Sequence, residues 1–214
     1  MKLVSVNVSI PKVVIWQGRP LRTGIFKEPV EGRIKVRKLN LEGDAQADLR
    51  VHGGVDKAVY GYPAEHYRTW SEELGRDLPF GQFGENLTVE GLLEDQVRIG
   101  DIYRIGTTRL QVSQPRTPCH KLAARMASEE FPFRFLQSGR SGFYLRVLEE
   151  GELGRGDSIH RESREAESLT VLEACFLLLE GPADLALLRR AADQASLSAS
   201  WRMQFRQRLS DLEG

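Results

Sequence analysis

Short runs of β-branched and aromatic residues, each broken by glycine or proline, fill the first three quarters of the chain. Runs of this length between turn residues are typical of strands in a barrel or a sandwich. The pattern predicts strands over residues 3–10, 12–16, 33–39, 86–90, 101–105, 109–113 and 142–148. Helical spacing interrupts them only at 64–74 and 121–128. We therefore expect a mainly β domain with a few short helices.

The chain changes character after residue 162, because residues 162–167 are densely charged and are the best candidate for a linker. Apolar residues then recur at helical spacing over 168–180, 183–195 and 198–212. Ser168 or Thr170 can cap the first of these helices, and Gly181-Pro182 can end it. The pattern predicts a β domain over 1–162 and a small three-helix domain over 168–214.

Charge balance, hydrophobicity and cysteine content exclude several classes of protein. The 214 residues carry 30 Lys and Arg and 30 Asp and Glu, a balance that argues against a general binder of polyanions. No apolar run approaches the length of a membrane span, and the polar N-terminal residues do not have the pattern of a signal peptide. Two cysteines in unlike settings provide no disulfide framework, so we expect a cytoplasmic protein.

Residues 114–122 have the chemistry of a reactive-cysteine loop. Pro115 and Pro118 hold the backbone around Cys119 out of helix and sheet ladder. Nearby basic side chains favour an ionised sulfur, which is the nucleophilic and metal-binding form: these are Arg116, His120 and Lys121. Cys175, by contrast, lies in an apolar helical run and is expected to be a buried structural residue.

Small residues beside polar side chains recur in three further segments. Lys27 follows the flexible Gly24, and His52 and Lys57 flank a glycine pair that allows close approach of an anion. Asn86 offers an amide at the start of a strand. Turn chemistry alone accounts for two other glycine–aspartate pairs, at 43–44 and 100–101.

Three kinds of site are compatible with these residues. A zinc site would use His52, His66, Cys119 and His120, but the spacing matches no zinc motif. A Cys–His hydrolase or acyltransferase would use Cys119 as nucleophile and His52 as base. A metal bound through one protein thiolate, with its other ligands from an anionic organic cofactor, fits a lone activated cysteine among cations better.

Several segments, in order along nearly the whole chain, resemble MOSC-domain proteins, whose fold is named after the C-terminal domain of molybdenum cofactor sulfurase. The resemblance is to the bacterial YiiM-like branch in particular, in which a three-helix domain follows the barrel. The matching segments are 23–27 (TGIFK), 41–44 (LEGD), 51–58 (VHGGVDKA), 62–67 (YPAEHY), 83–87 (FGENL), 100–101 (GD) and 111–119 (QVSQPRTPC).

The resemblance implies a MOSC-type β-barrel that binds molybdenum cofactor (molybdopterin), with Cys119 as molybdenum ligand or sulfur carrier. By analogy, the residues expected to line the cofactor pocket are Lys27, His52, Lys57 and Arg116, with Asn86 and Thr117 as weaker candidates. The expected activity is reduction of N-hydroxylated compounds such as hydroxylaminopurine, with His52 or Lys57 as proton donor. Because the chain has no evident flavin, haem or iron–sulfur motif, a separate reductase would supply the electrons. Pyridoxal phosphate binding is associated with the family only at a general level.

Two alternatives stay open at this point. Cys119 could carry a persulfide or hold the cofactor for delivery to another enzyme. The arginines of the tail could instead bind nucleic acid, although acidic residues among them favour an ordinary solvated or packed face. These arginines are Arg189, Arg190, Arg202, Arg206 and Arg208.

Overall fold

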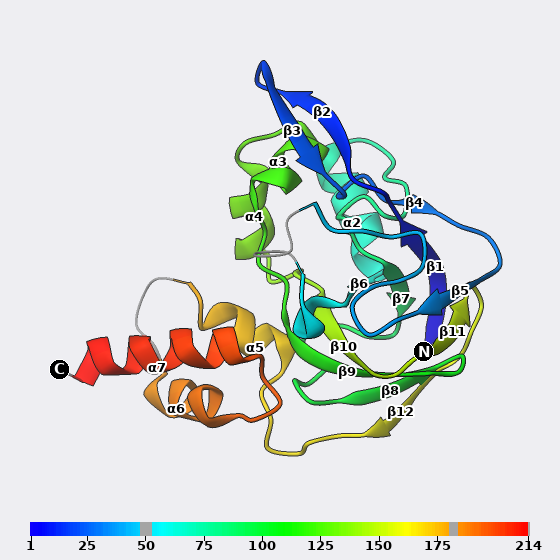
Figure 1. The fold of residues 1–214 in the computed structure, drawn as a ribbon. Helices are drawn as coiled ribbons and strands as arrows, with labels where there is room; N and C mark the ends of the chain where they lie inside the picture. Colours follow the sequence, from blue (N-terminus) through cyan, green and yellow to red (C-terminus); the bar gives the residue numbers. More distant parts are fainter. Residues whose placement is uncertain (48–52, 180–183, 214) are drawn as a thin grey trace.

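An eight-stranded sheet forms the centre of the computed structural model, which describes residues 1–47, 53–179 and 184–213 (Figure 1). The described strands are antiparallel neighbours except for one parallel pair, β6 with β7. In spatial order they are β12 (Ile159–Ser163), β8 (Ile102–Ile105), β9 (Thr108–Pro115), β10 (Phe143–Glu149), β6 (Val59–Pro63), β7 (Leu87–Glu90), β1 (Lys2–Val8) and β4 (Glu28–Pro29).

The sheet curls until β1 meets the segment that leads into β12. The amide of Leu3 donates to the carbonyl of Asp157 at 2.9 Å, and that of Ile159 donates to Met1 at 3.0 Å. Among the described residues the paired strands form an open sheet that runs from β12 to β4. A single isolated bridge, between Lys2 of β1 and Ser158 just before β12, connects the two sides of this sheet. The expected barrel is therefore a large curled sheet that closes at one short contact.

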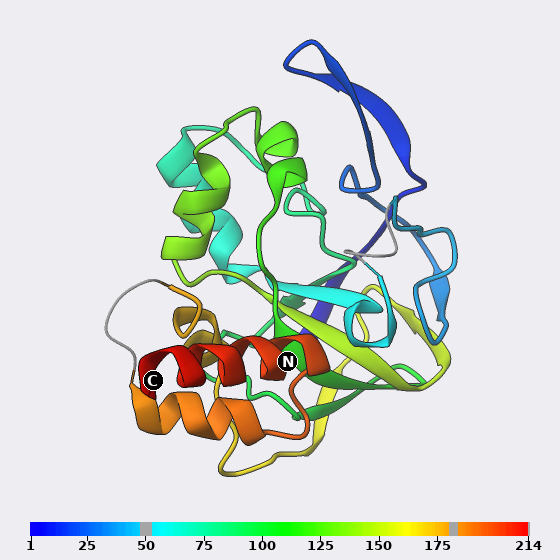
Figure 2. The same ribbon diagram turned by 60° about the vertical axis from the view of Figure 1, so that its left-hand side comes forward.

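Two small sheets flank the large one. One pairs β5 (Arg33–Val36) with β11 (Gly151–Gly154). The other is the hairpin of β2 (Lys12–Trp16) and β3 (Arg19–Thr23), which projects from the body in both views (Figures 1 and 2). Its two turn residues, Gln17 and Gly18, have φ of 53° and 72°, the positive values of a two-residue turn that matches strand twist.

Aromatic side chains form a second core beside the sheet. This core lies among α2 (Glu65–Leu74), α3 (His120–Met126) and α4 (Phe131–Gln137), and it contains Trp70, Phe83, Phe131 and Phe135. The short 3₁₀ turn η1 (Val55–Lys57) leads directly into β6. No helix within the described ranges is both long and apolar enough to cross a membrane.

Three C-terminal helices pack on the sheet: α5 (Val171–Phe176), α6 (Leu185–Asp193) and α7 (Ala199–Glu213). Their buried residues, including Leu188 and Trp201, belong to the same apolar cluster as the sheet core. The Thr170 side chain caps α5 in a reciprocal capping box with Glu173, as the sequence indicated for Thr170. The predicted stop at Gly181-Pro182 lies outside the described residues.

Most of the tail arginines make local contacts. Arg190 donates to the carbonyl of Glu167 at 2.8 Å, Arg202 to that of Ala195 at 2.7 Å, and Arg208 to that of Leu179 at 3.1 Å. Arg206 lies 3.9 Å from Asp193. The guanidinium groups of Arg190, Arg202 and Arg208 thus satisfy carbonyls at helix ends and connections, which is a structural use of their charge.

Seven of the described elements were not predicted from the pattern: β3, β4, η1, β6, α4, β11 and β12. The linker expectation for 162–167 was wrong at its start, because Glu162 and Ser163 belong to β12. The Glu162 carboxylate accepts hydrogen bonds from Arg104 at 2.5 Å and Arg109 at 2.7 Å. Only the first residue of β12 is buried, so this strand lacks the alternation by which strands are recognised.

Candidate cofactor-binding site

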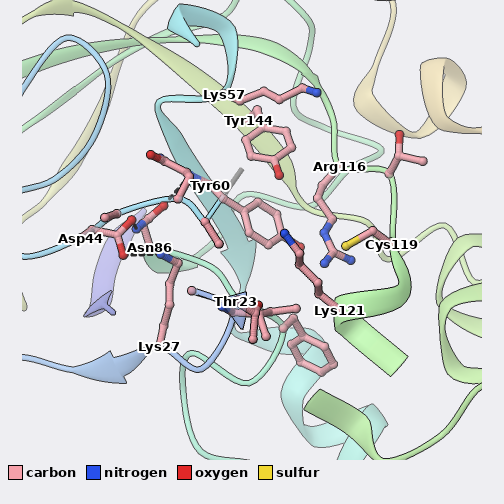
Figure 3. A pocket seen from close by; sticks show the side chains of 18 residues that line it. Thr23, Lys27, Asp44, Lys57, Tyr60, Asn86, Arg116, Cys119, Lys121 and Tyr144 are labelled. Atoms are coloured by element: carbon pink, nitrogen blue, oxygen red, sulfur yellow. Dashed lines mark hydrogen bonds and ion pairs between the residues drawn. The ribbon is translucent and has the colours of Figure 1, made fainter. Parts of the chain in front are cut away.

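A cavity opens between the base of the β2–β3 hairpin, η1 and the loop from β9 to α3 (Figure 3). The space between protein atoms amounts to about 640 Å³ when its open mouth is included. Every predicted site residue that the structure describes lines it: Lys27, Lys57, Asn86, Arg116, Thr117 and Cys119. His52 lies outside the described residues.

Cys119 stands at the N-terminal boundary of α3 with extended backbone angles, and its side chain is half-buried. The expectation that Pro115 leaves the sheet was wrong, because Pro115 ends β9 and is paired with Phe143. The loop therefore comprises residues 116–119. Arg116 and Lys121 line the cavity with Cys119, whereas His120 is exposed and is not part of the lining.

Arg116 is the most constrained cation of the site. It is 4% exposed, and its guanidinium carbon lies 5.5 Å from the ring centre of Tyr60 and 5.2 Å from that of Phe135. Burial opposes its charge, but the neighbouring Tyr60, Cys119 and Tyr144 raise the pKa of Arg116. Its buried Nη1 has no hydrogen-bond partner among the described residues. Figure 3 shows this guanidinium beside the Cys119 sulfur, so a permanent positive charge stands next to the thiol at the cavity wall.

Tyr60 and Tyr144 complete this side of the cavity and were not foreseen. They are direct cross-strand partners in the β6–β10 ladder, and their ring centres lie 5.3 Å apart. Burial raises the pKa of Tyr144, while a hydrogen bond with Arg116 opposes the rise. The Tyr60 hydroxyl donates to the carbonyl of Ser141 at 2.8 Å. No local sequence signal could have found a pair whose members are brought together by strand register.

Lys57 and Lys121 add positive charge to the same side. Lys57 is half-buried, and burial lowers its pKa while the adjacent Asp56 opposes that change. Lys121 is 9% exposed, although it comes from the first turn of a short helix. Figure 3 shows the Lys121 ammonium and the Arg116 guanidinium near the Cys119 sulfur, with Lys57 farther away, beyond the Tyr144 ring.

Lys27 and Asn86 lie on the opposite side of the cavity, where both side chains bind the carboxylate of Asp44 (Figure 3). The Lys27 ammonium is in direct contact with the Asp44 carboxylate. Asp44 also accepts from the Ser9 amide at 2.9 Å and from Asn86 Nδ2 at 3.0 Å. Burial lowers the pKa of Lys27, and Asp44 opposes this. Asp44, which was assigned to turn chemistry from the sequence, thus neutralises this half of the cavity.

The other titratable residues that the sequence singled out lie apart from the cavity lining. His66 Nε2 is 2.7 Å from Glu94 Oε2, which leaves no support for a zinc site that includes His66, Cys119 and His120. Among the described residues no group of three or more His, Cys, Asp or Glu side chains is placed to hold a metal ion. Cys175 is 1% exposed, and burial raises its pKa to about 11, which confirms its structural character.

Sequence profiles place the chain among known proteins. The profile of the MOSC domain matches residues 48–160, more than half of the chain. The chain belongs to the MOSC domain family. A second profile, that of the YiiM-like three-α-helix domain, matches residues 169–211 of this MOSC protein. Both matches confirm the resemblance drawn from the motifs.

Individual relatives cover most of the MOSC protein. It is 43% identical over 203 residues to the uncharacterized protein YflK of Bacillus subtilis (strain 168), covering 95% of this chain and 92% of YflK. It is 36% identical over 188 residues to the protein YiiM of Escherichia coli (strain K12), covering 86% and 83% of the two chains. The crystal structure of YiiM from Geobacillus stearothermophilus superposes with a TM-score of 0.82 at 38% identity, covering 97% of this chain and 98% of that one.

A more distant relative of the MOSC protein is considerably longer. A protein of Gibberella moniliformis (strain M3125 / FGSC 7600) named reductase is 33% identical over 159 residues. The match covers 72% of this chain but only 28% of that protein. A MOSC-like segment therefore occurs there as a minor part of a larger polypeptide.

Proposed function

We propose that this protein binds molybdenum cofactor in the cavity and uses it to reduce N-hydroxylated compounds such as hydroxylaminopurine. The observation that carries the proposal is the pairing of one accessible thiol, Cys119, with a buried guanidinium whose Nη1 has no partner among the described residues. Membership of the MOSC family and the reductase named among the relatives support an oxidoreductase of this kind.

The donor set of the cavity suits this cofactor. A metal in the cavity would find one sulfur ligand, because the described residues include no cluster of further metal-binding side chains. Its remaining ligands must then come from an organic molecule, and a soft thiolate suits a thiolate-rich molybdenum centre. The pterin part carries a phosphate, for which Arg116, Lys57 and Lys121 supply positive charge and donors.

The bound cofactor would supply two-electron redox chemistry, and the chain itself would position the substrate and deliver protons. The net reaction cleaves one N–O bond: a hydroxylamine, two electrons and two protons give an amine and water. Lys57 is a suitable proton donor at this mouth because burial lowers the pKa of its ammonium group. The Tyr144 hydroxyl, oriented by Arg116, is a second donor on the same side. The electrons would come from a separate reductase.

Metal analysis tests the proposal most directly. Wild-type protein, Cys119→Ala and the control Cys175→Ala are purified anaerobically from a host that makes molybdenum cofactor, and molybdenum and released pterin are measured in each. We expect near-stoichiometric molybdenum in the wild type and in Cys175→Ala, and at least a tenfold loss in Cys119→Ala with its urea-unfolding midpoint unchanged. Substrate reduction driven by a reduced viologen dye should follow the molybdenum content.

Other outcomes would reject the proposal. Well-folded wild-type protein without molybdenum or pterin, and without dye-driven reduction after incubation with the isolated cofactor, would exclude a cofactor enzyme. A persulfide on Cys119 in such metal-free protein would indicate sulfur carriage instead.

A further inference from the structure

The β2–β3 hairpin presents an apolar face that no other described element covers. Its strands pair only with each other in the described sheets, and it projects from the body in both views (Figures 1 and 2). The register pairs Val13 with Arg22 and Ile15 with Pro20, so these four side chains share one face. Val13 is 62% exposed and Ile15 is 71% exposed, which is unusual for large aliphatic residues on a strand.

The same hairpin carries an uncompensated positive charge. The chain as a whole is neutral, yet its first 27 residues contain no Asp or Glu. The side chains of Arg19 and Arg22 are exposed, and neither guanidinium forms an ion pair or hydrogen bond with any described residue. Lys12 differs, since it lies 3.9 Å from Glu28 and over the ring of Phe26. A protruding surface with an aliphatic centre and free guanidinium groups is typical of an interface for an acidic partner.

The position of the hairpin relates this face to the cavity. Thr23, the last residue of β3, and the following Gly24 line the cavity. Arg22 is therefore one residue away from the lining, and Arg19 is about 14 Å away at a rise of roughly 3.4 Å per residue. A protein that binds the hairpin would thus lie beside the mouth of the cavity.

We propose that this face, formed by Val13, Ile15, Pro20 and Arg22 and extended by Arg19 beside the turn, binds an acidic surface of the protein that delivers electrons to the cavity. The inference rests on the proposed function, because each N–O bond cleaved requires two electrons that the chain does not itself store. The donor is a reduced flavoprotein or similar redox protein: it loses two electrons, and the substrate takes them up with two protons. Attraction between opposite charges would accelerate the encounter, and the aliphatic centre would stabilise the short-lived complex.

The test compares two ways of supplying electrons to holoprotein loaded with molybdenum cofactor. Reduced methyl viologen is a small donor that needs no docking surface, whereas NADPH plus a fractionated host extract supplies electrons through a protein. The charge variant is Arg19→Glu/Arg22→Glu and the apolar variant is Val13→Ser/Ile15→Ser. The matched control, Arg68→Glu/Arg206→Glu, makes the same change in net charge at exposed positions on α2 and α7.

We expect both hairpin variants to lose about tenfold in NADPH-driven rate at low salt while their dye-driven rate stays within twofold of wild type. The control should retain both rates. Added KCl should slow the NADPH-driven reaction of the wild type and have little effect on the charge variant.

Each remaining outcome contradicts the inference in a recognisable way. Unchanged NADPH-driven rates in both hairpin variants would place the donor elsewhere, and equal loss of dye-driven rate would mean that the hairpin shapes the cavity. Dye-driven activity with no extract fraction able to support NADPH turnover would exclude a protein donor. Hairpin-dependent sedimentation with phosphatidylserine vesicles, with unchanged NADPH-driven rates, would assign the face to a membrane surface. Wild-type protein inactive with the dye would reject the proposed function itself.

Discussion

Replacing Lys27 by methionine should destabilise the protein strongly, because it removes the cation of a buried ion pair. The side chains of Lys27 and Asp44 are 8% and 1% exposed. Removing one partner of such a pair costs about 3–5 kcal/mol, since the remaining charge stays in a poorly solvated place. Asp44 would keep its hydrogen bonds from the Ser9 amide and from Asn86, which favours the lower end, about 3 kcal/mol.

Urea unfolding followed by circular dichroism measures this loss. With a slope of about 2–3 kcal/mol/M, a loss of about 3 kcal/mol moves the midpoint by roughly 1 M. Lys12→Met is the control, because its 3.9 Å contact with Glu28 joins two exposed side chains and should be worth less than about 1 kcal/mol. Adding Asp44→Asn to Lys27→Met should recover part of the loss, because it removes the unpaired charge.

Two results would refute this reasoning. A loss in Lys27→Met no larger than that in Lys12→Met would mean that the pair contributes little to folding. A further fall in stability on adding Asp44→Asn would mean that the unpaired carboxylate is not the source of the cost. If molybdenum content fell while stability did not, Lys27 would act as a cofactor ligand, as the family resemblance implied, and not through Asp44.

Three further predictions concern the capping box, the buried cysteine and the tyrosine pair. Thr170→Ala should lower the unfolding free energy by about 1 kcal/mol, because the amide of Glu173 loses its acceptor; a circular-dichroism melt no lower than that of the exposed control Ser200→Ala would contradict this. Burial raises the pKa of Cys175 from its ordinary 9.0 to about 11. Between these values the folded chain keeps a thiol proton that the unfolded chain releases. The resulting stabilisation of the folded state is complete below pH 9 and is lost as the pH rises toward 11. The stability of wild type relative to Cys175→Ala should therefore fall by up to about 3 kcal/mol across that window in urea titrations, and a constant difference would be inconsistent with a buried thiol. Tyr144→Phe should lower the dye-driven rate about tenfold with molybdenum content unchanged, and loss of molybdenum instead would assign Tyr144 to cofactor binding.

Elements with a local pattern of residues could be predicted from the sequence. The hairpin strand at 12–16, the helix at 64–74 and the three tail helices follow from periodicity and turn residues, and Thr170 caps α5 because the capping box spans only four residues. Elements without a local signature could not be predicted. All five residues of β6 are buried, so it shows no alternation, and α4 spaces three phenylalanines every second residue as a strand would.

Some features of the candidate site could likewise be predicted from the sequence, and others could not. Loop chemistry around Cys119, together with the family motifs, was enough to select Arg116, Lys57 and Thr117, all of which line one cavity. The charge of that cavity could not be read from the chain, because charge depends on partners that folding brings together. Asp44 neutralises Lys27 from 17 residues away, and the β6–β10 register sets Tyr60 beside Tyr144 to enclose Arg116. Residue type and spacing thus identify which groups carry the chemistry. Which of their charges face the cavity depends on folding, because burial and pairing are properties of the packed chain.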